Sequence, residues 1–276
     1  MPELPEVETT RRGLSSWVEG QRVVGWKVRN PLLRWPVQIP EQLRDERLTA
    51  LKRRGKYLLF EFPSGTLIVH LGMSGSLRLV APDVEPGKHD HVDLCFTPNL
   101  VVRLNDPRRF GSVLWWPSEE ESHRLLAHLG LEPLSREFVP EYLKKMAKSR
   151  KLAVKNFIMD SRVVVGVGNI YAAEALFLAG IRPTVPAGRV TLKGYELLVA
   201  AIKGVLAEAV EVGGTTLRDF VGSDGKPGYF QQQLNVYGRA GQACRRCSCV
   251  LKNRRVGQRA TVFCPKCQRS QGFGRS

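Results

Sequence analysis

The chain has 276 residues, of which 43% are hydrophobic and 25% are charged. This length predicts about two domains, and the composition is that of globular proteins that bury a core, not of disordered or collagen-like chains. There are 42 Lys and Arg against 26 Asp and Glu, a formal net charge of +16. Such an excess favours polyanions, nucleic acid before an anionic membrane surface, and excludes an acidic, disulfide-built extracellular module.

The N-terminal residues predict a short amphipathic helix with acids at its start. Pro5 suits the first helical turn. The residues that would share the apolar side are Leu4, Val7, Leu14 and Trp17 or Val18. Glu3 and Glu6, three residues apart, would lie on one face at the positive end of the helix dipole. Ordinary helix capping is one explanation of both acids, and a catalytic role beside Pro2 is the other.

Pro2 indicates a different chemistry. A small second residue permits removal of Met1, which exposes the secondary amine of Pro2. With a pKa of about 7.7–8.0, roughly a tenth of an ordinary N-terminal amine is unprotonated at neutral pH. Such an amine can attack a sugar C1′ as a nucleophile, while a neighbouring carboxylate moves protons or stabilises an oxocarbenium-like sugar. If Met1 stays attached, Pro2 is an amide and cannot attack.

Residues 20–116 are rich in short apolar or alternating runs separated by turn residues, a pattern typical of a β-sandwich. The expected strands are 22–29, 56–62, 66–71, 76–80, 91–96, 100–104 and 112–116. Cys95 falls within one of them and is most simply a small core residue.

Residues 119–211 have a helical pattern, with Pro133 and Pro140 marking the connection between domains. A helix over 195–212 is expected to stop at Gly213 and Gly214. The apolar stretch 163–181 is long enough to span a bilayer, but glycines interrupt it and Glu174 lies inside it. Together with an N-terminus that lacks the features of a signal peptide, this predicts a soluble, cytoplasmic protein.

The C-terminal residues 239–276 carry ten basic residues and no acid. Their cysteines follow the spacing of a structural zinc site, Cys244-x2-Cys247-x16-Cys264-x2-Cys267. Four thiolates leave no open position, so one zinc ion is expected to hold the structure and take no part in chemistry. Cys249 is a competing ligand or a spare thiol. Between the pairs we expect two short strands, 249–251 and 260–263, joined by a basic loop, 252–259, that fits a DNA groove.

Several motifs together resemble one family across essentially the whole chain. They are PELPEVE at 2–8, RRGKY at 53–57, HLGMSG at 70–75, DPRRFG at 106–111, VGVGNIY at 165–171, GGTT at 213–216 and the four-cysteine segment. In this order they resemble the bacterial formamidopyrimidine-DNA glycosylases, also called 8-oxoguanine-DNA glycosylases. The resemblance implies an α+β multidomain fold: a β-sandwich with flanking helices (1–133), a helix-two-turn-helix domain (134–238) and a zinc-finger β-hairpin (239–276).

The resemblance also implies an activity. The enzyme would remove oxidised purines, 8-oxoguanine and formamidopyrimidines, from duplex DNA and then cleave the abasic site as a lyase. It would act as a monomer with zinc as its only cofactor. Pro2 would form a Schiff base with C1′, Glu3 would be its acid/base partner and Glu6 would support that site. Lys56 and Arg259 would complete the catalytic set by binding phosphates beside the lesion. The remaining residues implied to contact the lesion or other parts of the DNA are His89, Lys155, Asn169 and Tyr237.

Met73, Arg108 and Phe110 match the family's trio that enters the duplex. Flipping a base leaves a hole that Met and Phe can fill, while Arg donates to the orphaned base. Without the resemblance, Met73 and Phe110 would be read as core residues, and His70 as a hydrogen-bonded strand histidine. Residues 217–229, which carry three glycines, resemble a mobile loop that covers an everted purine; the alternative is a plain exposed loop.

Two other functions compete with this hypothesis. Endonuclease VIII-like enzymes of the same superfamily prefer oxidised pyrimidines, but Leu4 and the DPRRFG segment favour the purine enzyme. A non-catalytic zinc-ribbon protein would bind DNA but gives no reason for Pro2, Glu3 and Glu6. A zinc deaminase is excluded because no histidine has Glu two residues later.

Overall fold

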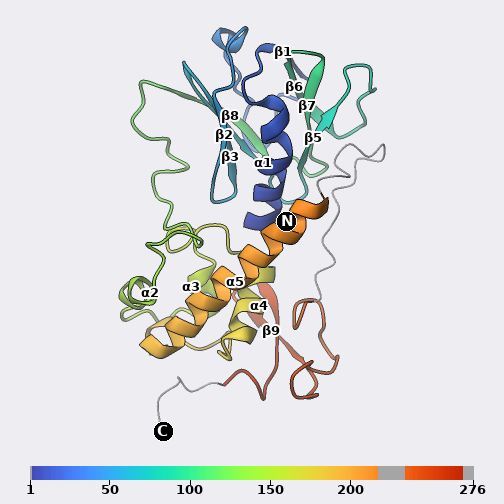
Figure 1. Ribbon diagram of the computed structural model, residues 1–276. Coiled ribbons are helices and arrows are strands. Elements are labelled where there is room, and N and C mark those ends of the chain that lie inside the picture. The colour runs from blue at the N-terminus through green and yellow to red at the C-terminus, as the bar shows by residue number, and fades with distance from the viewer. Residues whose placement is uncertain (1, 217–233, 270–276) are drawn as a thin grey trace. The chain divides into compact units, whose positions relative to one another are not determined.

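The computed structural model describes residues 2–216 and 234–269. The chain divides into two compact units, one built from Met1–Ala127 and Val210–Phe230, the other from His128–Ala209 and Gln231–Ser276 (Figure 1). The division into three domains at 133/134 and 238/239 therefore stays a prediction. The four-cysteine segment belongs to the second unit.

The first unit contains the predicted β-sandwich. One antiparallel sheet has the order β2 (Ala50–Arg54), β3 (Tyr57–Phe62), β4 (Gly65–His70), β8 (Ser112–Pro117). The other has the order β1 (Val23–Val28), β6 (Asp90–Phe96), β7 (Leu100–Asn105), β5 (Ser76–Val80). Seven strands lie where the short apolar or alternating runs predict them. The eighth, β2, was missed, because its sequence Ala-Leu-Lys-Arg-Arg has a single buried side chain, Leu51.

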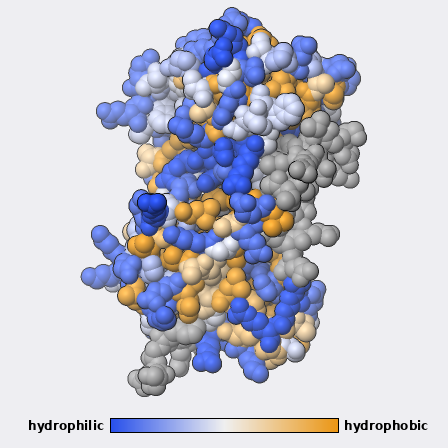
Figure 2. Space-filling model, viewed as in Figure 1, coloured by the Kyte–Doolittle hydropathy of each residue, from blue (hydrophilic) through white to orange (hydrophobic). Residues whose placement is uncertain are grey.

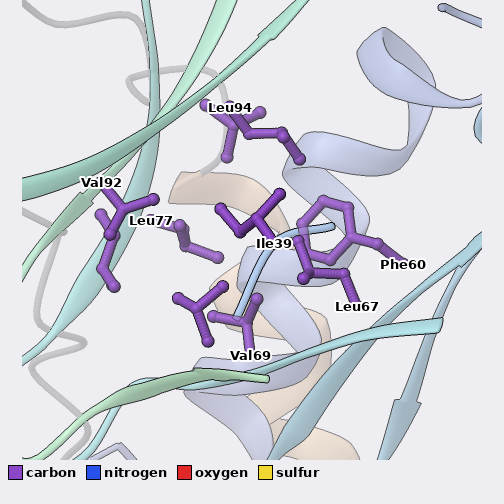
Figure 3. A pocket seen from close by; sticks show the side chains of 10 residues that line it. Ile39, Phe60, Leu67, Val69, Leu77, Val92 and Leu94 are labelled. Carbon is purple, nitrogen blue, oxygen red and sulfur yellow. The ribbon is translucent and has the colours of Figure 1, made fainter. Parts of the chain in front are cut away.

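The core of this unit lies between the two sheets. Figure 3 shows side chains from both sheets converging, with Phe60, Leu67 and Val69 from one and Leu77, Val92 and Leu94 from the other. The small gap between them is lined only by aliphatic side chains and one phenyl ring. A space without a polar group to orient a ligand is packing space, so the active chemistry must lie elsewhere.

Helix α1 (Leu4–Val18) contacts β2 and β3 of one sheet and β5 of the other. Val7, Leu14 and Val18 are buried against the core, as predicted, but Trp17 is 55% exposed and lies off the apolar face. A short 3-10 helix, η1 (Glu41–Leu43), follows β1. The first unit thus places the N-terminus of α1 on a rigid β scaffold.

The second unit contains the helices α2 (Pro140–Met146), α3 (Val154–Ile158), α4 (Asn169–Leu178), the 3-10 helix η2 (Ala187–Arg189) and most of α5 (Leu192–Thr216). The expected helical pattern from residue 119 was wrong for its first part, since 119–139 forms turns and bends without a helix. No helix among residues 2–216 and 234–269 is long and apolar enough to cross a membrane. Figure 2 shows hydrophilic side chains over much of the visible face, interrupted by apolar patches.

Helix α5 does not stop at Gly213 and Gly214 as predicted but runs to Thr216. A Cβ at Gly213 would collide with the side chain of Thr9 on α1. The glycine therefore serves close packing of two helices in the first unit, and the helix continues through it.

The basic ribbon also differs from its prediction. Its strands are β9 (Lys252–Val256) and β10 (Arg259–Phe263), so most of the expected loop 252–259 is strand and only Gly257 and Gln258 form the turn. Gly257 adopts a φ of +61°, a left-handed conformation that favours glycine at a tight turn. The ribbon packs with the cysteine segment on Ala173 and Phe177 of α4.

Candidate active site and nucleic-acid interface

The first candidate site lies at the start of α1. Glu3 is the N-cap residue and is only 2% exposed. The Glu6 carboxylate accepts the backbone N–H of Glu3 at 2.8 Å, while the Glu3 carboxylate accepts the backbone N–H of Glu6. This capping box confirms the structural explanation of both acids. It also fixes the peptide that carries Pro2, which is half-buried and precedes the helix.

The second candidate site is formed by the two crossover loops, residues 71–75 between β4 and β5 and residues 106–111 between β7 and β8. The register pairs His70 with Ser112 and Ser76 with Asn105, so both loops leave the sandwich at one end. Met73 is 36% exposed and Phe110 is 43% exposed. Neither is a core residue, and the Arg108 guanidinium lies over the Phe110 ring at 4.8 Å. The three residues predicted to enter a duplex therefore share one end of the β-sandwich.

Asp106 organises the second crossover loop, a role that the sequence did not reveal. It is fully buried, and its carboxylate accepts the backbone N–H of Gly111 at 2.7 Å and that of Arg108 at 3.3 Å. The Ser74 hydroxyl donates to the same carboxylate at 3.4 Å, which connects the two crossover loops. The backbone N–H of Asp106 donates to the carbonyl of His89 at 2.9 Å, so half-buried His89 lies beside this loop.

Lys56 lies at the same end of the sandwich, in the β2–β3 turn, because Tyr57 pairs with His70 in the sheet. His70 is a hydrogen-bonded histidine, as its residue type suggested: its Nδ1 accepts the backbone N–H of Gly72 at 3.0 Å. Burial, with the positive charges of Lys56 and Arg34, lowers the pKa of His70 to about 4. The imidazole is therefore neutral at pH 7, with its other nitrogen protonated for donation.

In the second unit, three elements meet at Lys155. The side chain is fully buried and its Nζ donates to Asn169 Oδ1 at 2.5 Å and to Thr261 Oγ1 at 2.7 Å. Lys155 belongs to α3, Asn169 is the first residue of α4 and Thr261 lies on β10. This arrangement is suited to holding Asn169 and the ribbon in place; it gives Lys155 itself no exposed surface for a DNA contact.

Glu174 holds the chain that leads into the cysteine segment. It is 4% exposed, and its carboxylate accepts the backbone N–H groups of Asn235, Val236 and Tyr237 at 2.8, 2.9 and 2.9 Å. The side-chain amide of Asn235 adds a fourth bond at 3.0 Å. A buried carboxylate in a helix thereby fixes the backbone position of Tyr237.

We expect Glu174→Gln to destabilise the second unit by about 3 kcal/mol, because an amide NH2 would face donors that now bond to a charged acceptor. Urea unfolding measures this effect. Glu196→Gln is the matched control, since Glu196 pairs with Lys193 at 2.9 Å on the surface of α5 and its side chain is 44% exposed. Equal unfolding midpoints for the two variants would contradict the role of Glu174.

The four predicted zinc ligands meet at one point. The Sγ atoms of Cys244, Cys247, Cys264 and Cys267 all lie within 4.8 Å of one another. Backbone N–H groups of Arg246 and Cys267 donate to the sulfurs of Cys244 and Cys264 at 3.4 and 3.3 Å, which stabilises thiolates. The donor set thus fits a tetrahedral metal ion. Cys249 is not in this group of four.

Arg259 is exposed at the start of β10, paired with Val256 across the turn of the ribbon. Strand β9 adds the exposed cations Lys252, Arg254 and Arg255. The ribbon therefore presents the concentrated positive charge that phosphate binding requires. Residues 217–229, expected to form a loop over the everted base, lie outside the described residues.

Comparisons with known proteins agree with these features. Residues 1–113 match the formamidopyrimidine-DNA glycosylase N-terminal domain and residues 129–221 match the formamidopyrimidine-DNA glycosylase H2TH domain. A formamidopyrimidine-DNA glycosylase of Magnetococcus marinus is 56% identical over 275 residues, covering 98% of this chain and 100% of the relative. That of Methylococcus capsulatus is 57% identical over 271 residues, with the same coverage.

Solved structures show the same fold. The MutM (Fpg) protein of Thermus thermophilus superimposes with a TM-score of 0.83 at 39% identity, covering 98% of this chain and 100% of that one. The Lactococcus lactis enzyme, bound non-covalently to DNA with an AP site, gives 0.85 at 30% identity and covers 96% and 99%.

With these relatives, the fold and the two candidate sites are those of a DNA glycosylase that acts on damaged bases. The chain belongs to the formamidopyrimidine-DNA glycosylase family.

Proposed function

We propose that the enzyme excises oxidised purines from duplex DNA through the amine of Pro2 and then opens the abasic site. After removal of Met1, the Pro2 nitrogen attacks C1′, the C1′–N bond to the base breaks and the base leaves with a proton. The C1′–O4′ bond of the sugar then breaks as O4′ takes up a proton, which leaves an iminium between the Pro2 nitrogen and C1′. The iminium acidifies the C2′ hydrogens, and successive β- and δ-eliminations release the 3′ and then the 5′ phosphate. Covalent catalysis by an amine divides one difficult displacement into easier steps.

The capping box carries this proposal. A nucleophile must be held within hydrogen-bonding reach of its acid/base partner, and the reciprocal bonds between Glu3 and Glu6 hold the backbone beside Pro2. Glu3, which is buried next to Pro2, protonates and deprotonates the sugar ring. Glu6 positions Glu3.

Each unit offers residues to the phosphates of the damaged strand: Lys56 in the first unit, and Asn169 and Arg259 in the second. Lys155 acts on the DNA through Asn169 and β10, because it is buried between them. His89 and Tyr237 add contacts beside the crossover loop and beside α4. One structural zinc ion, held by the four cysteines, fixes the ribbon that carries Arg259.

Met73 and Phe110 fill the space left by the everted base, and Arg108 donates to the base that has lost its partner. Their exposure and their common end of the sandwich support this role. The enzyme acts in the cytoplasm, where bacterial DNA lies. It acts as a monomer, and its three domains are residues 1–133, 134–238 and 239–276.

Gly72→Ala is expected to impair the insertion of Met73, Arg108 and Phe110 into the duplex. Gly72 has a φ of +66°, and a Cβ there would lie 2.5 Å from the backbone nitrogen of Gly111. The substitution pushes the two crossover loops apart, so excision of 8-oxoguanine should fall at least tenfold, about 1.4 kcal/mol of barrier. Gly20→Ala is the control: its φ of +79° imposes similar backbone strain, but no atom lies within 4 Å. Excision rates that fall equally in both variants would count against the packing argument.

The proposed function is tested by borohydride trapping on a duplex with 8-oxoguanine opposite cytosine, using protein whose N-terminus mass spectrometry identifies as Pro2. A covalent adduct of enzyme and DNA is expected. Tight binding without an adduct would favour a non-catalytic DNA-binding protein. An adduct formed only with an oxidised pyrimidine would keep the mechanism and change the substrate.

A further inference from the structure

Residues 34–38, which belong to none of the sequence motifs quoted above, lie against the second crossover loop. Strand β8 ends its sheet, and residues 34–38 lie along its open edge. The backbone N–H of Arg34 donates to the carbonyl of Gly111 at 3.1 Å, and that of Gln38 donates to Val113 at 3.0 Å. Arg34 is thereby anchored to the residue that follows Phe110.

The side chain of Arg34 is held by an aromatic platform. Its guanidinium lies 4.7 Å from the ring centroid of Trp35, and the guanidinium of Arg124 lies 6.0 Å from the same ring. Stacking restrains a planar guanidinium while leaving its N–H edge available for two parallel hydrogen bonds. Arg34 is exposed, and within residues 2–216 and 234–269 it makes no ion pair with a carboxylate. Its charge is therefore available to an external anion.

Arg34 lies among the groups that would face the DNA backbone. It is bonded to Gly111, whose neighbour Ser112 pairs with His70 in the sheet. Its charge acts together with that of Lys56 on His70. Repulsion between the exposed Arg34 guanidinium and the positive charges around it raises the free energy of the protein without DNA. A bound anion removes this repulsion.

We propose that Arg34, supported by the Trp35 ring, binds a backbone phosphate of the duplex next to the crossover loops. This rests on the proposed function, since it assumes that the crossover loops enter DNA. A phosphate takes the bidentate contact that a stacked guanidinium offers, and a lysine ammonium cannot reproduce it. Arg34 thus adds to affinity and to register on the DNA, and takes no part in bond breaking.

A matched control exists on the opposite sheet of the same unit. Arg44 lies 5.2 Å from the ring of Trp26, the same type of stack, but it also pairs with Glu41 at 3.5 Å and donates to the Val24 carbonyl at 3.1 Å. Like Arg34→Ala, Arg44→Ala removes one positive charge and one stacked guanidinium from the first unit. It therefore measures how much this loss alone changes DNA binding, without the proposed phosphate contact.

The test measures equilibrium binding of full-length protein to a duplex with a tetrahydrofuran abasic analogue over a series of salt concentrations. Each phosphate contact contributes about 0.9 to the slope of log K against log salt. Arg34→Ala and Arg34→Gln should lower the slope by about one contact and weaken binding about tenfold. Arg34→Lys should keep the slope but bind several-fold more weakly. The yield of trapped adduct on an abasic site at saturating enzyme should stay unchanged in all three.

Equal slopes and affinities for Arg34→Ala, Arg34→Gln and Arg44→Ala would overturn the proposal, as would a loss of trapping at saturation with unchanged binding. Failure of the parent protein itself to form an adduct would refute the proposed function instead. Circular dichroism confirms that each variant is folded. If Arg34→Ala unfolds, Arg34→Gln, which keeps part of the aliphatic stem and a polar end but removes the charge and the bidentate donor pair, still carries the comparison.

Discussion

Protein that retains Met1 is expected to form no borohydride-trapped adduct with 8-oxoguanine DNA. The methionine converts the Pro2 nitrogen to an amide, whose lone pair is delocalised and cannot attack C1′. We expect a loss of about a thousandfold or more, because covalent catalysis has no substitute nucleophile in the capping box. Binding to the tetrahydrofuran duplex should change by no more than a few-fold, since the phosphate contacts are intact.

The control is the same enzyme with one methionine appended to its C-terminus and a free Pro2. Gel analysis of trapped complexes, with the N-terminus verified by mass spectrometry, measures the effect. Equal adduct yields with and without Met1 would show that another nucleophile acts, and Pro2 would lose its assigned role.

Loss of the metal is expected to have the second large effect. Structural zinc supplies apparent folding free energy of about 10–16 kcal/mol in small domains, far above what a ribbon with few buried residues obtains from its own core. Cys264→Ser should therefore release the ion and unfold the segment that carries Arg259. Affinity for lesion DNA should fall at least a hundredfold, about 2.7 kcal/mol.

Cys249→Ser separates a ligand from a spare thiol. The four clustered sulfurs exclude Cys249, so this variant should keep one zinc per chain by elemental analysis and bind DNA as the parent does. Full zinc content and full affinity in Cys264→Ser, or loss of zinc from Cys249→Ser, would contradict the assignment of the ligands.

Where the sequence predicted the fold correctly, local pattern and packing agreed. Seven strands are short apolar or alternating runs bounded by turn residues, whereas β2 is mostly charged and is a strand because it pairs with β3. The helix end at Gly213 was wrong for a tertiary reason: glycine there admits the Thr9 side chain. The prediction of a basic loop over 252–259 was wrong because a segment rich in cations resembles a solvent-exposed loop in sequence. Pairing with β10 makes most of it a strand.

The candidate site was predicted in part. The resemblance to the family identified the residues that would contact DNA. It did not identify the residues that hold these side chains and loops in position. Glu174 was noticed only because it interrupts an apolar run; its four donors come from a segment 61–63 residues away in sequence. Asp106 lies in a recognised motif, yet its bonds to Gly111 and Ser74 depend on how two crossovers meet. The position of Arg34 follows from an edge contact with β8 that no sequence pattern indicates.

The two crossover loops have a mechanical consequence. Each begins in one sheet and ends in the other, so a force on Phe110 is transmitted to β7 and β8, and through the Ser74–Asp106 bond to β4 and β5. A base stack that resists opening therefore loads the strands of both sheets at the same time, and neither sheet bears the force alone. The side chains of Met73, Arg108 and Phe110 can therefore change to suit a lesion while the loops stay anchored in both sheets. A one-residue insertion in either β4 or β8 would instead shift the strand register that anchors both crossover loops.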